Sequence, residues 1–139
     1  MLDQLKRLYT EGLSILVFEG DTDLYSSYQP GVRPLLELVD WFPFGLGAAT
    51  VADRVVGACA ARIFAYLRPA AVLGGIGSTE AAHILFTTGI NHSFEETVPQ
   101  ILNRDNTGVC PFERLSTDCT DVHELIRRIR ARLAEPNQA

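Results

Sequence analysis

Residues 71–76 constrain the fold of this chain most, because this stretch (AVLGGI) is apolar throughout and carries no charge. Short apolar runs of this kind are typical of strands that are buried on both faces, and such strands lie in parallel sheets covered by helices. The run is also far too short to cross a bilayer, which takes about 20 apolar residues in a helix. We therefore expect a sheet with helices on both of its sides.

Helical patterns flank this strand on both sides. Upstream, Thr50 is expected to cap a helix over residues 51–67, with Asp53 and Arg54 in its first turn. The apolar face of this helix is broad: Val55, Val56, Cys59, Ile63, Phe64 and Leu67. Downstream, Ser78 is expected to cap a helix over residues 79–88, which Gly89 ends. Residues 91–98 form the next predicted strand.

The first fifty residues predict a helix and a hairpin. Leucines at near-helical spacing indicate a short amphipathic helix before the first strand: Leu2, Leu5, Leu8 and Leu13. Residues 14–18 and 24–28 are strand candidates, and the turn-forming residues between them make the pair an antiparallel hairpin. Pro34 then opens a helix over residues 35–41. Near the other end of the chain, Asp121 is expected to cap a helix over residues 122–133.

A hairpin followed by alternating helices and strands describes an α/β protein. Helical crossovers make their strands parallel, whereas the hairpin is antiparallel, so we predict a three-layer α/β/α sandwich with a mixed sheet. With 139 residues, of which 47% are hydrophobic, the chain has the size of a single domain over residues 1–139.

Charge and cysteine content narrow the class of protein. The formal net charge of -5 disfavours nonspecific binding to nucleic acid. The three cysteines are an odd number, and the first residues form a charged stretch rather than a secretory leader. We therefore expect a cytoplasmic protein with reduced thiols and no membrane association. Of these cysteines, Cys59 is assigned to core packing and Cys119 to a surface loop.

The polar stretch over residues 103–113 (NRDNTGVCPFE) is expected to line a site, because it gathers amide, guanidinium, carboxylate and thiol groups. Cys110 falls at an N-cap position before Pro111, which is the favoured first residue of a helix. Its thiol would face free backbone N–H groups, which favour an anion: a thiolate, or a bound phosphate or carboxylate. Ligands in such sheets bind near the carboxyl ends of strands and helix N-termini, where Asp53, Ser78 and this stretch are expected to converge.

Three motifs occur in an order that resembles a known family: residues 31–36 (GVRPLL), 52–57 (ADRVVG) and 103–113. Together they resemble the prokaryotic domain of unknown function 1893, and the resemblance covers nearly the whole chain. It implies a cytidine-deaminase-like α/β/α fold. The family has no established activity, so the resemblance implies a fold rather than a function.

The chain departs from the zinc deaminases where their metal ligands would stand. Those enzymes carry a His or Cys ligand near a catalytic Glu on one helix and two Cys ligands on the next. The corresponding stretches here are residues 51–53 (VAD) and 77–81 (GSTEA), without a nitrogen or sulfur ligand, although a catalytic zinc needs about three protein ligands. His83, His92 and His123 each stand alone. We therefore expect no metal and no cofactor.

Two functions from different classes stay open. The first is a binding module whose nucleoside-sized cleft takes a small anionic or planar molecule, with nucleosides and nucleotides as candidates. Its expected ligand contacts are Arg33, Arg54, Asn103, Arg104, Asp105 and Glu113. The second is a metal-independent enzyme or redox-sensitive protein, in which Cys110 is the catalytic nucleophile and Asp53 or Asp105 moves a proton. No histidine near Cys110 in sequence supplies a base, so we prefer the binding module.

The same residues also have structural interpretations. Asp53 can complement a helix dipole, and Cys110 can be a small buried apolar group. Arg104 and Asp105 can form a local ion pair that fixes their loop. Glu113 can make a capping-box contact with Cys110, which lies three residues earlier.

A homo-oligomer is a further expectation. The edge of the hairpin and a group of aromatic residues supply a surface for self-pairing: Trp41, Phe42 and Phe44. The alternative is that these aromatic residues form a satellite core.

Overall fold

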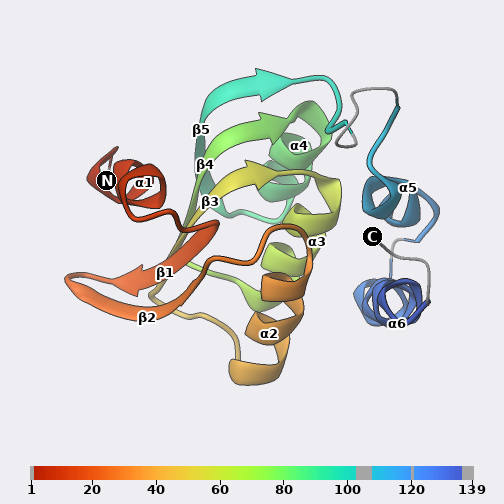
Figure 1. Cartoon of the computed structure of the whole chain (residues 1–139), viewed down its shortest axis with the longest axis horizontal. Coiled ribbons are helices and arrows are strands. Elements are labelled where there is room, and N and C mark those ends of the chain that lie inside the picture. Colours follow the sequence, from red (N-terminus) through yellow and green to blue (C-terminus); the bar gives the residue numbers. More distant parts are fainter. Residues whose placement is uncertain (1, 103–107, 120, 136–139) are drawn as a thin grey trace.

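The computed structural model describes residues 2–102, 108–119 and 121–135, which form a five-stranded sheet and six helices (Figure 1). In chain order the elements are α1 (Leu2–Thr10), β1 (Ile15–Glu19), β2 (Thr22–Ser27), α2 (Arg33–Trp41), β3 (Thr50–Val56), α3 (Ala58–Leu67), β4 (Ala71–Ser78), α4 (Thr79–Thr87), β5 (Asn91–Val98), α5 (Pro111–Asp118) and α6 (Val122–Leu133).

The sheet is mixed, as predicted. Its strand order is β2-β1-β3-β4-β5. Strand β1 runs antiparallel to both β2 and β3, whereas β3, β4 and β5 are parallel to one another. The helices α3 and α4 supply the two crossovers between the parallel strands.

Helices cover both faces of this sheet, which confirms the three-layer α/β/α sandwich (Figure 1). Helix α1 lies on one face against β1, β3 and β4, while α2, α3 and α4 lie on the other. The last two helices, α5 and α6, pack on the outer side of α3. The apolar residues divide accordingly into a larger core around α3 and a smaller one beneath α1. Within the described ranges, no helix is long and apolar enough to cross a membrane.

Strand β4 is buried on both faces, as its composition predicts. Val72 belongs to the larger core and Leu73 to the smaller one. Local signals also identified several other elements correctly. Strand β5 has the predicted bounds, and the hydroxyl of Ser78 accepts a hydrogen bond of 3.0 Å from the backbone N–H of Ala81 at the start of α4. The side chain of Asp121 caps α6 by accepting a hydrogen bond from the backbone N–H of His123.

The prediction of one helix over residues 51–67 is wrong, because its first part is strand β3. Val51, Val55 and Val56 are β-branched and favour extended backbone, and β3 is paired on both sides, with β1 and with β4. Helix α3 begins only after Gly57. Asp53 and Arg54 therefore do not share a first helical turn, and as neighbours in a strand they point to opposite faces of the sheet.

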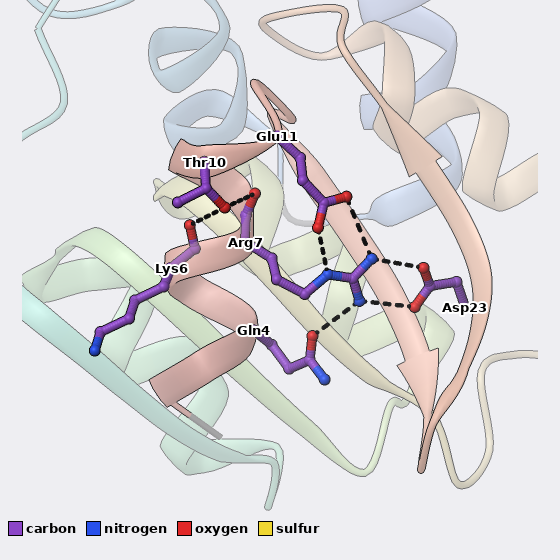
Figure 2. Close-up of polar contacts among 6 residues, drawn as sticks. All are labelled: Gln4, Lys6, Arg7, Thr10, Glu11 and Asp23. Carbon is purple, nitrogen blue, oxygen red and sulfur yellow. Dashed lines mark hydrogen bonds and ion pairs between the residues drawn. The ribbon is translucent and has the colours of Figure 1, made fainter.

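Arg7 ties α1 to the hairpin. Its guanidinium donates two hydrogen bonds to the carboxylate of Asp23 in β2, at 2.8 and 3.0 Å, and two to that of Glu11, at 2.7 and 3.4 Å (Figure 2). The side-chain oxygen of Gln4 accepts a further one at 3.1 Å. These bonds hold the hairpin against α1 on the side of the sheet away from α3.

Candidate functional site

A cavity of about 230 Å³ lies where β1 and β3 meet the N-terminal ends of α2, α3 and α5. Most of its wall is apolar and includes Ile15, Val32, Leu35, Ala60 and Phe112. The polar or ionisable residues that line it come from distant parts of the sequence: Ser14, Asp53, Arg54, Cys59, Cys110 and Glu113. Asp53 was predicted to converge with the polar stretch over residues 103–113. Of the described residues of that stretch, Cys110 and Glu113 do line the same cavity as Asp53. Ser78 lies outside this wall and lines a neighbouring cavity of about 60 Å³, which shares Glu113 and Ile101 with the first.

Asp53 is held in the middle of the sheet. Its backbone is paired with Ile15 of β1 and Gly74 of β4, so its position is fixed from both sides. The side chain is half-buried, and the backbone N–H of Val55 lies 3.4 Å from its Oδ1 atom. Burial raises the pKa of this carboxyl group to about 7, although the N–H groups of Val55 and Arg54 favour the ionised form.

Glu113 reaches from α5 to the N-terminus of α3. Its carboxylate oxygens accept hydrogen bonds from the backbone N–H groups of Ala58 and Cys59, at 2.6 and 2.9 Å. These N–H groups have no partner within α3, so Glu113 acts as the cap that α3 lacks in its own sequence. Burial raises the pKa of Glu113, while the two N–H donors work in the opposite direction. The expected capping-box contact with Cys110 is therefore wrong, since the carboxylate caps a different helix.

Cys110 is the N-cap residue of α5, and Pro111 begins that helix, as predicted. The backbone carbonyl of Cys110 accepts hydrogen bonds from the N–H groups of Glu113 and Arg114, at 3.0 and 3.2 Å. Its thiol makes no capping hydrogen bond and is half-buried at the cavity wall.

The other two thiols are buried. Cys59, which also lines the cavity, has its pKa raised by burial. Cys119 was expected in a surface loop, but it lies at the end of α5 with its Sγ atom 3.4 Å from the carbonyl oxygen of Asp121. The surface assignment is wrong, because Cys119 is buried and belongs to the larger core.

The guanidinium of Arg54 does not point into the cavity. It donates hydrogen bonds of 2.6 Å to the carbonyl oxygens of Leu8 and Leu13, and it stacks on the ring of Tyr9 with its Cζ atom 4.8 Å from the centroid. These partners belong to α1 and the loop after it, on the other face of the sheet. The position expected for this side chain is therefore wrong, because residues 50–56 form a strand whose consecutive side chains alternate between the faces.

The remaining predicted contacts fall outside the cavity or outside the described residues. Arg33 is exposed at the start of α2 and does not line the cavity. Asn103, Arg104 and Asp105 lie outside the described residues.

Some lining residues were missed by the sequence analysis. Ser14 is one of them, and its hydroxyl shares its one hydrogen between the carbonyl oxygens of Ser27 and Gln29, at 3.0 and 2.6 Å. Leu35 and Ala60 look like ordinary core residues in sequence, since nothing in their spacing marks a wall. The signal that was available is Gly57, a glycine directly before a helix that has no capping side chain of its own.

The comparison with zinc deaminases placed one of its two stretches on the wrong element. Val51, Ala52 and Asp53 belong to β3, whereas residues 77–81 do span the start of a helix, α4. The helices that start at the cavity are α2, α3 and α5. Among the residues that the structure describes, no three His, Cys, Asp or Glu side chains lie close enough together to hold a metal ion.

Comparisons with known proteins give a family without a described activity. A family model described as a domain of unknown function (DUF1893) matches residues 4–133. The crystal structure of a DUF1893 family protein from Thermotoga maritima is similar to this chain, with a TM-score of 0.85 and 28% sequence identity. That similarity covers 94% of this chain and 88% of the Thermotoga chain. No curated protein matches the chain.

Proposed function

This chain belongs to the DUF1893 family, as its motifs predicted, and we propose that it binds a small organic molecule in the cavity between α2, α3 and α5. The observation that carries the proposal is the meeting of Asp53, Cys110 and Glu113 at one mostly apolar cavity, although they lie far apart in sequence. Apolar walls with a few polar groups are typical of small-molecule sites.

The size of the cavity suits a ring. An engineered protein cavity of about 150 Å³ holds a benzene molecule, so about 230 Å³ accommodates a ring with substituents. The base of a nucleoside has this shape. We therefore keep nucleosides and nucleotides as candidate ligands, with the sugar reaching toward solvent.

The remaining expectations stay part of this proposal. We propose a cytidine-deaminase-like fold, a cytoplasmic location and no association with membranes or nucleic acid. Self-association through the aromatic surface also stays a proposal. Trp41 is 62% exposed and Phe44 fully exposed, whereas Phe42 packs against the core. The first two side chains are therefore available for a contact between copies.

A thermal-shift screen tests the binding proposal. Nucleosides, nucleotides and small carboxylates are added to the full chain, and a ligand that binds the folded state raises the melting temperature. The variant Val55→Trp adds bulk at the cavity wall at a position that is 44% exposed and tolerates it. Its control is Ile76→Trp, since Ile76 pairs with Val55 in the neighbouring strand but does not line the cavity.

We expect the ligand-induced shift to disappear in Val55→Trp and to persist in Ile76→Trp. A screen in which no compound stabilises the chain would contradict the proposal. Equal shifts in both variants would place the binding site elsewhere.

A second candidate is a metal-independent enzyme that uses Cys110. It is favoured by one observation: Asp53 lines the same cavity as the Cys110 thiol. Because the pKa of Asp53 is about 7, its carboxylate is suited to act as a general base near neutral pH. The rate of alkylation by iodoacetamide as a function of pH tests this candidate. A midpoint well below the free-thiol value of about 8.5, and its change in Asp53→Asn, would support it. An inert Cys110 thiol would exclude it.

A further inference from the structure

We propose that the cavity selects a ligand whose N–H donors, carried by a small cation such as an amidinium, bind the carboxylate of Asp53. This inference rests on the proposed function, because it assumes that a ligand enters this cavity. It also reverses the charge expected from the sequence, which favoured an anion.

Three of the polar side chains at the cavity, those of Ser14, Arg54 and Glu113, already have close partners. The Ser14 hydroxyl shares its one hydrogen between two backbone carbonyl oxygens. The guanidinium of Arg54 is bound on the other face of the sheet, and the carboxylate of Glu113 is held by two N–H groups of α3. Displacing any of them would leave a partially buried partner unsatisfied, which is costly. A ligand therefore has to find its polar anchor elsewhere on the wall.

Asp53 is that anchor. The protein groups that approach its carboxylate are the backbone N–H groups of Val55, at a long 3.4 Å, and of Arg54, which also donates to the carbonyl oxygen of Ser14 at 3.2 Å. No cationic side chain of the described residues pairs with it. A carboxylate removed from water without a full set of donors is stabilised by any ligand that supplies them. The other polar side chains at the wall without a hydrogen bond in the described part of the chain are the thiols of Cys59 and Cys110, and a thiol is a weak donor and acceptor.

The helix N-termini at the cavity do not offset this preference. Three helices begin there, and such ends ordinarily attract anions. The N–H groups at the start of α3 are taken by the chain's own carboxylate, Glu113. Helices α2 and α5 both carry proline in their first two positions, Pro34 and Pro111, which have no N–H to donate. Few donors are therefore left for an anionic ligand among the described residues.

An amidinium fits both the charge and the size of the cavity. Its two parallel N–H groups match the two oxygens of a carboxylate, in the same way as the fork of an arginine. Attached to a ring, it places an apolar body against Ile15, Leu35 and Ala60 while its charged end meets Asp53. Benzamidine is the simplest such molecule.

Three probes with the same ring and different charge test the inference at pH 8 by calorimetric titration of the full chain. They are benzamidine, which is a cation, benzamide, which is neutral, and benzoate, which is an anion. We expect benzamidine to bind at least about tenfold more tightly than benzamide, as charge-assisted hydrogen bonds do, and benzoate not to bind. The variant Asp53→Asn should lose this tenfold preference, whereas the control Asp21→Asn, in the exposed turn of the hairpin, should keep it.

The outcomes separate this inference from the proposed function. Binding of benzoate as tight as that of benzamidine, or a preference unchanged in Asp53→Asn, would overturn the inference and leave a binding cavity of different selectivity. If none of the three probes binds, the inference is also overturned, while the proposed function falls only if the wider thermal-shift screen is empty as well.

Discussion

Gly57 and Glu113 depend on each other, although they lie on different elements. A Cβ atom on residue 57 would stand 2.5 Å from the Cδ atom of Glu113, so only glycine leaves room for this carboxylate at the start of α3. The carboxylate in turn satisfies the N–H groups of Ala58 and Cys59. This pair fastens α5, and with it Cys110, to the cavity.

The variant Gly57→Ala should therefore act through Glu113. Its methyl group expels the carboxylate, and the loss of a helix cap lowers the free energy of unfolding by about 1 to 2 kcal/mol. Glu113→Ala should cost a similar amount, and the double variant no more than Glu113→Ala alone, because the collision no longer exists. Urea denaturation of the four proteins measures this coupling. Simply additive losses would show that the two residues act independently.

The stability of the chain should depend on pH through Asp53. Burial raises its pKa to about 7 from an ordinary value of 3.8, so the folded chain retains a proton that the unfolded chain releases between about pH 4 and 7. Stability then falls as the pH rises through this range, by up to roughly 4 kcal/mol, and levels off above it. Asp53→Asn removes this fall and should be more stable than the natural chain at pH 8.

Urea denaturation at intervals from pH 4 to 8 checks this prediction. Asp21→Asn, at an exposed position, should retain the profile of the natural chain. A residual slope of the same sign is expected in Asp53→Asn, because burial also raises the pKa of Glu113. Parallel profiles for the natural chain and Asp53→Asn would show that Asp53 ionises as it does in water.

Arg54 should prove structural rather than ligand-binding. Lysine cannot reach the carbonyl oxygens of Leu8 and Leu13 together, so Arg54→Lys should lower the free energy of unfolding by about 1 to 3 kcal/mol. The affinity for benzamidine should stay within about twofold of the natural chain. Arg33→Lys, at an exposed site, serves as the control and should change neither quantity. A selective loss of affinity in Arg54→Lys would return this residue to the binding site.

The parts of the fold that sequence predicted are those with local signals. Strand β5 and the caps Ser78 and Asp121 were found because alternation and capping chemistry act within a few residues. Strand β3 was missed because Ala52 and the valines around it also fit a helix, and only pairing with β1 and β4 decides between the two states. Strand pairing of this kind gives no signal in the sequence of the strand itself.

The candidate site was predicted only in part for the same reason. The meeting of Asp53 with Cys110 and Glu113 was predicted from the rule that ligands lie near strand ends and helix starts. The rule was applied to Asp53 as a residue of a helix start, whereas it lies within β3, so the outcome was right and the local reason was not. Arg54 was predicted to point toward the ligand because residues 51–67 were predicted as one helix. Since residues 50–56 form a strand, its side chain points to the other face of the sheet. The target of Glu113, the N-terminus of a helix 54 and 55 residues earlier in the chain, depends on how α5 packs against α3 and has no signature in the spacing of residues.

Gly77 should not tolerate a side chain, because it makes room for Phe94 of the neighbouring strand. A Cβ atom on residue 77 would stand 2.5 Å from Cγ of Phe94, and a rigid aromatic ring held in a strand cannot easily move aside. Gly77→Ala should therefore lower the free energy of unfolding by about 1 to 3 kcal/mol. In the background of Phe94→Ala, the same substitution should cost much less, since the ring is gone. Ser93→Ala, next to Phe94 but exposed, is the control for strand β5 and should be nearly neutral. Thermal or urea unfolding of these variants decides the matter: an equal loss with and without the ring would mean that Gly77 is required for its backbone and not for the space it leaves.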